Sequence, residues 1–137
     1  MRILVDTSVW VDFLNGYPSL EQATLAALLE NDYDLCTCGV VVAEVFQGLR
    51  RDKGRDHLAQ SFQELTYLDP SGVGLYFRAA EIYRLLRARG VTVRSTIDGL
   101  IAALAEENGA ALLARDRDMK VILESGLVRA PRWPVAG

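Results

Sequence analysis

The sequence predicts an α/β fold in which helices pack on both faces of a parallel sheet. Short apolar runs that are typical of buried strands alternate along the chain with longer segments whose apolar residues recur at helical spacing. Strands that are joined through helices run parallel, and a parallel sheet is normally covered on both faces. The length of 137 residues fits one domain that spans residues 1–137.

The strands are expected where apolar residues are consecutive and no helical spacing is visible. The first is the run Ile3-Leu4-Val5, which begins almost at the N-terminus. The predicted strands, in order along the chain, lie at residues 2–5, within 32–38, at 66–68 and at 110–115.

The helices are expected between these strands, and their ends are marked by capping residues and glycines. Thr7 or Ser8 is the expected N-cap of the first helix, and Ser19 that of the second. Gly90 and Gly109 are expected to end the two longest helices. In chain order the predicted helices run from the first cap to residue 14, from 20 to 29, and over 40–50, 56–65, 74–89, 97–108 and 118–125.

Composition excludes several classes of protein. The apolar runs fall far short of the roughly 20 residues that a membrane helix needs, and the N-terminus lacks the long apolar stretch of a signal peptide, so we expect no membrane contact and a cytoplasmic location. Cys36 and Cys38 are one residue apart and point to opposite sides of a strand, which disfavours a disulfide. With His57 as the single histidine, a zinc site is not expected either.

Four acids occupy positions where the apolar pattern has no need of them. Asp6 and Asp116 close apolar runs that are predicted strands, whereas Glu44 and Asp98 interrupt apolar segments of predicted helices. Half-buried carboxylates repel one another and are costly unless a positive charge pairs with them. Ligands of parallel α/β sheets bind beyond the carboxyl ends of the strands. Because a hard divalent cation prefers oxygen ligands, the pattern predicts an acidic metal pocket.

A plainer interpretation exists for each acid taken alone. Asp6 and Asp116 could be helix N-caps, and Asp98 could be a first-turn acid that favours the positive end of its helix. Ser8 is expected to begin a helix and could also support the pocket. Asp118 is expected to be a helix cap rather than a ligand. One further acid, Asp12, is expected to be solvated.

Charge distribution is compatible with nucleic acid. The net charge is −3, but once the four pocket acids are set aside, the remaining 14 acids face 15 lysines and arginines. Those basic residues could contact phosphates. Candidate contacts are the basic run at residues 50–55 and a groove formed by Arg84, Arg87, Arg89 and Arg94. The aromatic residues Tyr76, Phe77 and Tyr83, at helical spacing, are expected in the core or at a dimer face.

Four segments in a fixed order resemble the PIN-domain ribonucleases, most of all the VapC-like toxins of bacterial toxin–antitoxin pairs. The segments are Leu4-Val5-Asp6-Thr7-Ser8-Val9-Trp10, Val42-Ala43-Glu44-Val45-Phe46-Gln47-Gly48, Ser95-Thr96-Ile97-Asp98-Gly99-Leu100-Ile101-Ala102-Ala103 and Leu112-Leu113-Ala114-Arg115-Asp116-Arg117-Asp118. The chain departs from the family at Ala114, where Thr or Ser is frequent, and at Met119, where Phe is usual.

The resemblance implies a three-layer α/β/α sandwich with a parallel sheet of about five strands. It implies that Asp6, Glu44, Asp98 and Asp116 serve a site for Mg2+ or Mn2+, with Ser8 and Asp118 in support. It also implies endonucleolytic cutting of RNA, a homodimer, and a small antitoxin protein that blocks the pocket. The alternatives are a phosphoacceptor signalling module, with Asp69 at a strand end, and an inactive α/β interaction domain.

Overall fold

The sheet has four parallel strands in the order β3-β2-β1-β4 in the computed structural model, which describes residues 1–50, 52 and 54–134. The strands are β1 (Arg2–Val5), β2 (Asp34–Thr37), β3 (Thr66–Tyr67) and β4 (Ala111–Leu113). All four predicted strands are present. The family resemblance had implied about five, so the sheet of the described residues is one strand smaller.

The C-terminal tail takes part of the place of a further strand. It runs parallel to β4 and pairs with it through a single bridge between Leu112 and Arg132. The N–H of Leu112 donates to the carbonyl of Pro131 at 2.9 Å, and the N–H of Trp133 donates to the carbonyl of Leu112 at 2.9 Å. Prolines cannot donate to a strand ladder, so Pro131 and Pro134 keep this pairing short.

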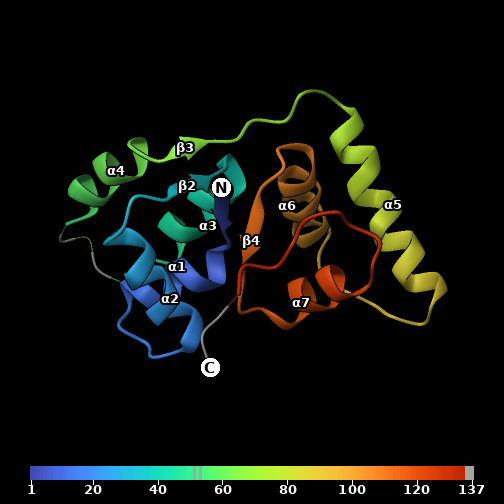
Figure 1. Cartoon of the computed structure of the whole chain (residues 1–137), viewed down its shortest axis with the longest axis horizontal. Helices are drawn as coiled ribbons and strands as arrows, with labels where there is room; N and C mark the ends of the chain where they lie inside the picture. Colours follow the sequence, from blue (N-terminus) through green and yellow to red (C-terminus); the bar gives the residue numbers. More distant parts are fainter. Residues whose placement is uncertain (51, 53, 135–137) are drawn as a thin grey trace.

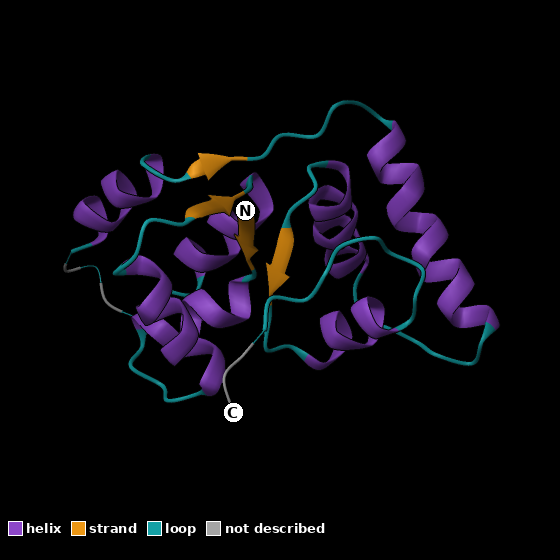
Figure 2. Ribbon diagram, viewed as in Figure 1, coloured by secondary structure: helices purple, strands orange, loops and turns teal. Residues whose placement is uncertain are grey.

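Seven helices flank the sheet in the described part of the chain (Figures 1 and 2). They are α1 (Thr7–Leu14), α2 (Leu20–Leu29), α3 (Gly39–Gln47), α4 (Arg55–Gln63), α5 (Gly74–Ala88), α6 (Thr96–Glu107) and α7 (Arg117–Glu124). Figure 1 shows α1 and α2 to one side of the strands and α5, α6 and α7 to the other. The predicted helices are therefore all present, and no end differs from its predicted position by more than three residues.

The N-caps agree with the prediction at one helix and correct it at another. Ser19 caps α2, where its side chain accepts a hydrogen bond from the N–H of Gln22 at 3.0 Å. The N-cap of α1 is Asp6, not Thr7 or Ser8. Asp6 keeps the extended backbone of the preceding strand (φ −69°, ψ 155°). Its carboxylate can therefore accept a hydrogen bond from the N–H of Ser8, two residues later. Because an N-cap residue has an extended backbone, Asp6 itself stays outside the helix, and α1 begins at Thr7.

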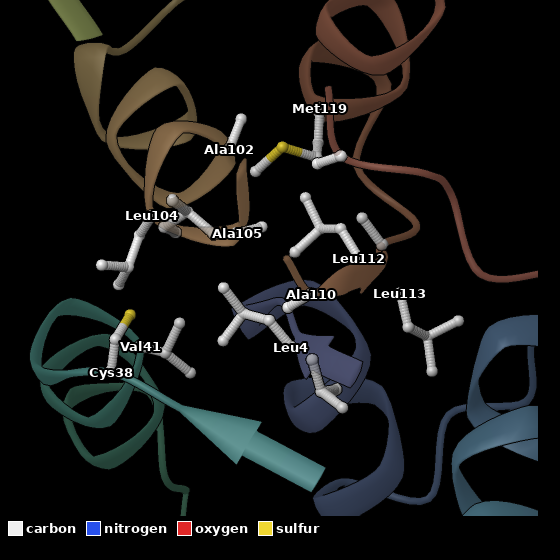
Figure 3. Close-up of a cluster of buried hydrophobic side chains, with 14 of the residues drawn as sticks. Leu4, Cys38, Val41, Ala102, Leu104, Ala105, Ala110, Leu112, Leu113 and Met119 are labelled. Carbon is white, nitrogen blue, oxygen red and sulfur yellow. The ribbon is translucent and has the colours of Figure 1, made fainter. Parts of the chain in front are cut away.

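The core lies between strands β1 and β4 and the helices that cover them. Ile3, Leu4 and Val5 of β1 have no exposed surface, and Leu112 and Leu113 of β4 have none either. Figure 3 shows side chains of α3 and α6 meeting those of these strands in one cluster. Met119 is fully buried and reaches toward Ala102 in that view, so the flexible thioether fills the space beside a small residue.

Gly99 allows α6 to approach α5 closely. A Cβ atom at position 99 would lie 3.3 Å from the carbonyl oxygen of Ala79 and 3.8 Å from its Cα, both of which are backbone atoms of α5. Gly99 follows Asp98, so this close approach also fixes the position of one of the predicted site acids. Both cysteines are buried and free, as expected. Within the described residues no helix has the length and apolar content to cross a membrane.

We predict that Gly99→Val lowers the free energy of unfolding by about 1–3 kcal/mol, because a branched side chain cannot enter the contact between α5 and α6 without moving backbone. Gly74→Val is the matched control, since a Cβ at position 74 meets nothing within 4 Å. Urea unfolding of both variants measures the effect. Equal destabilisation by the two substitutions would contradict the role given to Gly99.

Candidate metal centre

Neighbouring strands bring the two strand-end acids to one edge of the sheet. Strand β1 pairs in parallel with β4, with Val5 opposite Leu113. Asp6 follows β1 directly, and its N–H donates to the carbonyl of Leu113 at 2.9 Å. Strand β4 ends at Leu113, earlier than predicted, so Asp116 lies three residues beyond it as the N-cap of α7. Both acids therefore belong to helix starts at the carboxyl edge of the sheet, as well as to strand ends.

Three carboxylates converge at this edge. Asp98, in the first turn of α6, lies with Asp116 and Asp118 so that one oxygen of each is within 4.8 Å of the others. Asp98 and Asp116 are half-buried, and Asp118 is buried. We call Asp98, Asp116 and Asp118 the acid cluster. The cap predicted at Asp118 is wrong: Asp116 accepts the N–H groups of Asp118 and Met119 and caps the helix, which leaves the carboxylate of Asp118 free for other contacts.

Asp6 borders the acid cluster without belonging to its closest group. Its side chain is buried, and the hydroxyl of Ser8 donates to Oδ2 at 2.7 Å. Burial raises the pKa of Asp6; hydrogen bonds from Ser8 and Thr7 oppose this rise, and repulsion from Asp116 adds to it. The charge of Asp116 therefore acts on Asp6 across this edge of the sheet.

Glu44 is exposed on α3 and is not part of the acid cluster. The hydroxyl of Thr7 donates to Oε1 of Glu44 at 2.8 Å, so the first residue of α1 holds the glutamate. Burial raises the pKa of the Cys38 thiol, and the negative charges of Asp6 and Glu44 raise it further. Cys38 follows β2 directly and is the N-cap of α3, so its thiol lies at the same carboxyl edge of the sheet.

Asp98 carries the largest electrostatic cost in the site. Burial, followed by the charges of Asp6 and Asp116, raises the pKa of Asp98 from 3.8 to about 7. Near neutral pH the folded protein therefore holds this carboxyl close to half-protonated. A carboxyl group with such a pKa lacks a positive partner, and this is the condition that a bound cation would relieve.

Positive side chains compensate part of the cluster. Arg94 donates to Oδ2 of Asp118 from its backbone N–H at 2.9 Å and from Nε at 3.2 Å, and Arg117 contacts Oδ1 of the same residue at 3.2 Å. These hydrogen bonds lower the pKa of Asp118 despite its burial. The charge of Asp118 is thus satisfied by protein, whereas that of Asp98 is not.

A second ion pair, which the sequence analysis missed, braces the strand-end turn. Asp12 is buried instead of solvated, and Arg115 contacts both of its carboxylate oxygens, with Nη2 3.2 Å from Oδ1. The N–H of Arg115 also donates to the hydroxyl of Ser8, which in turn donates to Asp6. In the sequence, Arg115 directly follows an apolar run and precedes Asp116. A basic residue beside a buried strand needs an acidic partner, and this position was the signal that could have led to Asp12.

The ligand set fits a hard divalent cation. All candidate donors are carboxylate oxygens, and they come from segments that approach one another at the sheet edge. Ligands of Mg2+ lie about 2.1 Å from the ion, so two of them are at most about 4.2 Å apart. An oxygen spacing of up to 4.8 Å therefore needs only a small side-chain adjustment, or a water in place of one direct bond.

Two clefts with basic walls lie beyond the acids, near α1 and the start of α4. One, of about 530 Å3, has Arg50 and Arg55 in its wall, and the other, of about 270 Å3, has Arg50 and Arg115. The predicted basic run at 50–55 thus reaches these clefts through Arg50 and Arg55. Arg51 and Lys53 lie outside the described residues.

We predict that Asp98→Asn flattens the pH dependence of stability in the metal-free protein. The pKa of Asp98 is raised to about 7 in the folded state, so its contribution to stability is present in acid and is lost as pH rises toward 7. The asparagine variant should lose less stability than the parent between about pH 5 and pH 8. Urea unfolding in EDTA measures this, and an unchanged decline in the variant would contradict it.

We predict that Asp12→Ala lowers the free energy of unfolding by about 1–3 kcal/mol, because it leaves the anchored guanidinium of Arg115 without its buried partner. Asp52→Ala is the matched control: Asp52 contacts Arg55 at 3.4 Å, but its side chain is 95% exposed, so no measurable change is expected. Thermal and urea unfolding compare the two. A loss of the same size in both variants would show that Asp12 acts only as a surface charge.

Comparison with known proteins identifies the family of the chain. The PIN domain family matches residues 3–123. The chain is 36% identical over 121 residues to Ribonuclease VapC11 of Mycobacterium tuberculosis and to VapC ribonuclease Mb1587 of Mycobacterium bovis, which covers 88% of this chain and 90% of each relative.

Solved structures share the fold. A chain in the crystal structure of VapBC2 from Rickettsia felis, bound to a DNA fragment from its promoter, superposes with a TM-score of 0.71 at 20% identity and covers 98% of this chain and 100% of that chain. FitAcB from Neisseria gonorrhoeae gives a TM-score of 0.62 at 24% identity, with 88% and 92% covered. With the family match over most of its length and these relatives, the chain belongs to the PIN domain family, as a homologue of the VapC ribonucleases.

Proposed function

We propose that the protein is a metal-dependent endoribonuclease and the toxin of a toxin–antitoxin pair. The observation that carries the proposal is the convergence of Asp98, Asp116 and Asp118 beside Asp6, in a chain that is 36% identical to proteins named as ribonucleases. Among the described residues Asp98 has no positive partner beside its acidic neighbours, and a hard cation held between Asp98 and Asp116 would supply one. The whole chain, residues 1–137, acts in this proposal as one PIN-like domain.

In the proposed site Asp6, Asp98 and Asp116 hold Mg2+ or Mn2+. Asp98 and Asp116 offer oxygens from the acid cluster, and Asp6 borders them. Asp118 is already paired with Arg94 and Arg117, so it supports the site by holding these arginines rather than by giving both oxygens to an ion. Ser8 supports Asp6 by donating to Oδ2, which leaves Oδ1 for the cation.

The residues of the site divide the work of phosphodiester hydrolysis. The chemistry that a bound divalent cation supplies is Lewis acidity toward a phosphoryl oxygen and a lowered pKa of bound water. Glu44 would accept a hydrogen bond from a water at the site, while Thr7 holds its Oε1 in place. Arg50, Arg55 and Arg115 stand at clefts outside the acids, where the RNA backbone would pass.

Two apolar surfaces suit the proposed protein partners. Val73, Tyr76 and Phe77 are exposed at the start of α5 and form a face that a second copy of the chain would cover in a homodimer. This corrects the alternative that Tyr76 and Phe77 belong to the core. The small antitoxin is assigned to an apolar cleft of about 460 Å3 between α3 and α4, lined in part by Phe46 and Phe62.

The two alternatives receive less support. A phosphoacceptor module would use Asp69, but this residue is exposed in the loop after β3 and is absent from the group of acids that could share an ion among the described residues. An inactive interaction domain has no need of a carboxylate such as Asp98, whose pKa is raised to about 7 by burial and by its neighbours' charges.

We predict that Asp6→Asn lowers the rate of RNA cleavage by about a hundredfold or more and leaves the fold intact. Asparagine is a good N-cap and cannot carry the charge that burial disfavours, so the thermal stability of the metal-free variant should match or exceed that of the parent. Asp69→Asn is the matched control, and it should cut RNA at the parent's rate. Labelling of Asp69 by acetyl phosphate would instead favour the phosphoacceptor alternative.

Mapping of RNA 5′ ends after brief expression measures the same prediction in cells. The parent and Asp69→Asn should produce new 5′ ends that are missing with Asp6→Asn. Calorimetric titration of the purified proteins with Mn2+ should show binding to the parent and weakened binding to Asp6→Asn. Cleavage by Asp6→Asn at the rate of the parent would refute the assignment of the site.

A further inference from the structure

Arg94 places a guanidinium directly on the acid cluster. It stands two residues before the start of α6, and its backbone N–H and Nε both donate to Oδ2 of Asp118, at 2.9 and 3.2 Å. Its Nη2 lies 3.6 Å from Oδ1 of Asp116. One arginine thus pairs with two of the three acids of the cluster, although its own side chain is 78% exposed.

The two contacts of Arg94 differ in strength. The contact with Asp118 joins a buried carboxylate to the backbone and to the side chain of Arg94, so it persists when the outer end of the guanidinium moves. The contact with Asp116 is longer and open to water, and exposed ion pairs of this kind contribute little. Arg94 is therefore anchored at Nε and exchangeable at Nη2.

A cation at Asp116 and the Nη2 contact exclude one another. Two positive charges within a few ångströms of one carboxylate oxygen repel, and the guanidinium is the partner that can move. The guanidinium has five N–H donors in a fixed plane, and it is well suited to bind a phosphate with two of them at once. When it leaves Asp116, Arg94 would present its outer N–H groups beside the site, still held at Asp118.

We propose that Arg94 is the exchangeable counter-ion of the acid cluster: it pairs with Asp116 in the metal-free protein, gives up that contact when a divalent cation is bound, and then binds a phosphate of the RNA. This inference rests on the proposed function. It assigns Arg94 two effects of opposite sign, since the side chain weakens the binding of the cation and strengthens the binding of the substrate.

Metal titration without RNA tests the first effect. We expect Arg94→Gln to bind Mn2+ about three- to tenfold more tightly than the parent in calorimetry, because no guanidinium competes for Asp116. Arg117→Gln is the matched control: Arg117 contacts Asp118 at 3.2 Å and is 74% exposed, so the same charge is removed without a change at Asp116. Unchanged or weaker binding by Arg94→Gln, or an equal gain in Arg117→Gln, would overturn the proposal.

Cleavage kinetics at saturating Mn2+ test the second effect. Arg94→Gln should raise the KM for a single-stranded RNA, and the slope of log KM against log salt concentration should fall by about one, as for the loss of one phosphate contact. Arg117→Gln should keep the slope of the parent. An unchanged slope in Arg94→Gln would show that this side chain does not contact the phosphate.

If Arg94 had only a structural role, the expected results would differ from those expected if its guanidinium moves from Asp116 to an RNA phosphate. If the side chain only held the segment before α6 against Asp118, Arg94→Gln would weaken the binding of Mn2+ along with that of RNA. Arg94→Lys keeps the positive charge but loses the planar guanidinium. It is also the variant to measure if Arg94→Gln does not fold. This variant should bind Mn2+ within about twofold of the parent and still raise KM; an unchanged KM would overturn the proposal.

The two levels of inference fail in different ways. A parent protein that neither binds Mn2+ nor cuts RNA would contradict the proposed function. A parent that does both, beside an Arg94→Gln variant with the same metal affinity and the same salt slope, would contradict the role of Arg94 alone.

Discussion

Repulsion between carboxylates at one edge of the sheet is the constraint on which the site depends. The pairing of β1 with β4 and the entry of α6 bring Asp6, Asp98 and Asp116 together, although they are far apart in the sequence. The fold accepts the cost because the rest of this edge is held in place: Val5 and Leu113, at the strand ends, are fully buried, and α6 is held against α5 at Gly99. A rigid edge keeps the charges in place instead of letting them separate into water, so the site remains ready for a cation.

The two arginines of this edge, Arg94 and Arg115, have different roles. Arg115 is fixed by the buried Asp12 and by Ser8, so it stabilises the turn that carries Asp116. Arg94 is anchored at one end and exposed at the other, so it can respond to what the acids bind. The distinction arises from burial of the acid partner, because a buried ion pair is difficult to open and an exposed one is not.

Most of the fold could be predicted from periodicity and capping, because strands, helices and their glycine stops are local signals. The cap of α1 was misplaced because Asp6 serves as strand end and N-cap at once. Asp12 and Asp118 were misjudged for another reason: their burial depends on Arg115 and Arg94, partners more than 20 residues away, which no local pattern reveals. The acids at the ends of β1 and β4 were easier to interpret, because the geometry of a parallel sheet predicts that neighbouring strands meet there.

The tail alongside β4 has a consequence for how the molecule avoids unwanted association. A bare outer strand is a template for intermolecular sheet growth. Here Pro131 and Trp133 already occupy hydrogen-bonding positions of Leu112, and the opposite border of the sheet is formed by β3, which has two residues. Neither border offers a long ladder of free backbone groups, so copies of the chain can meet through side-chain surfaces and are poorly disposed to polymerise strand by strand.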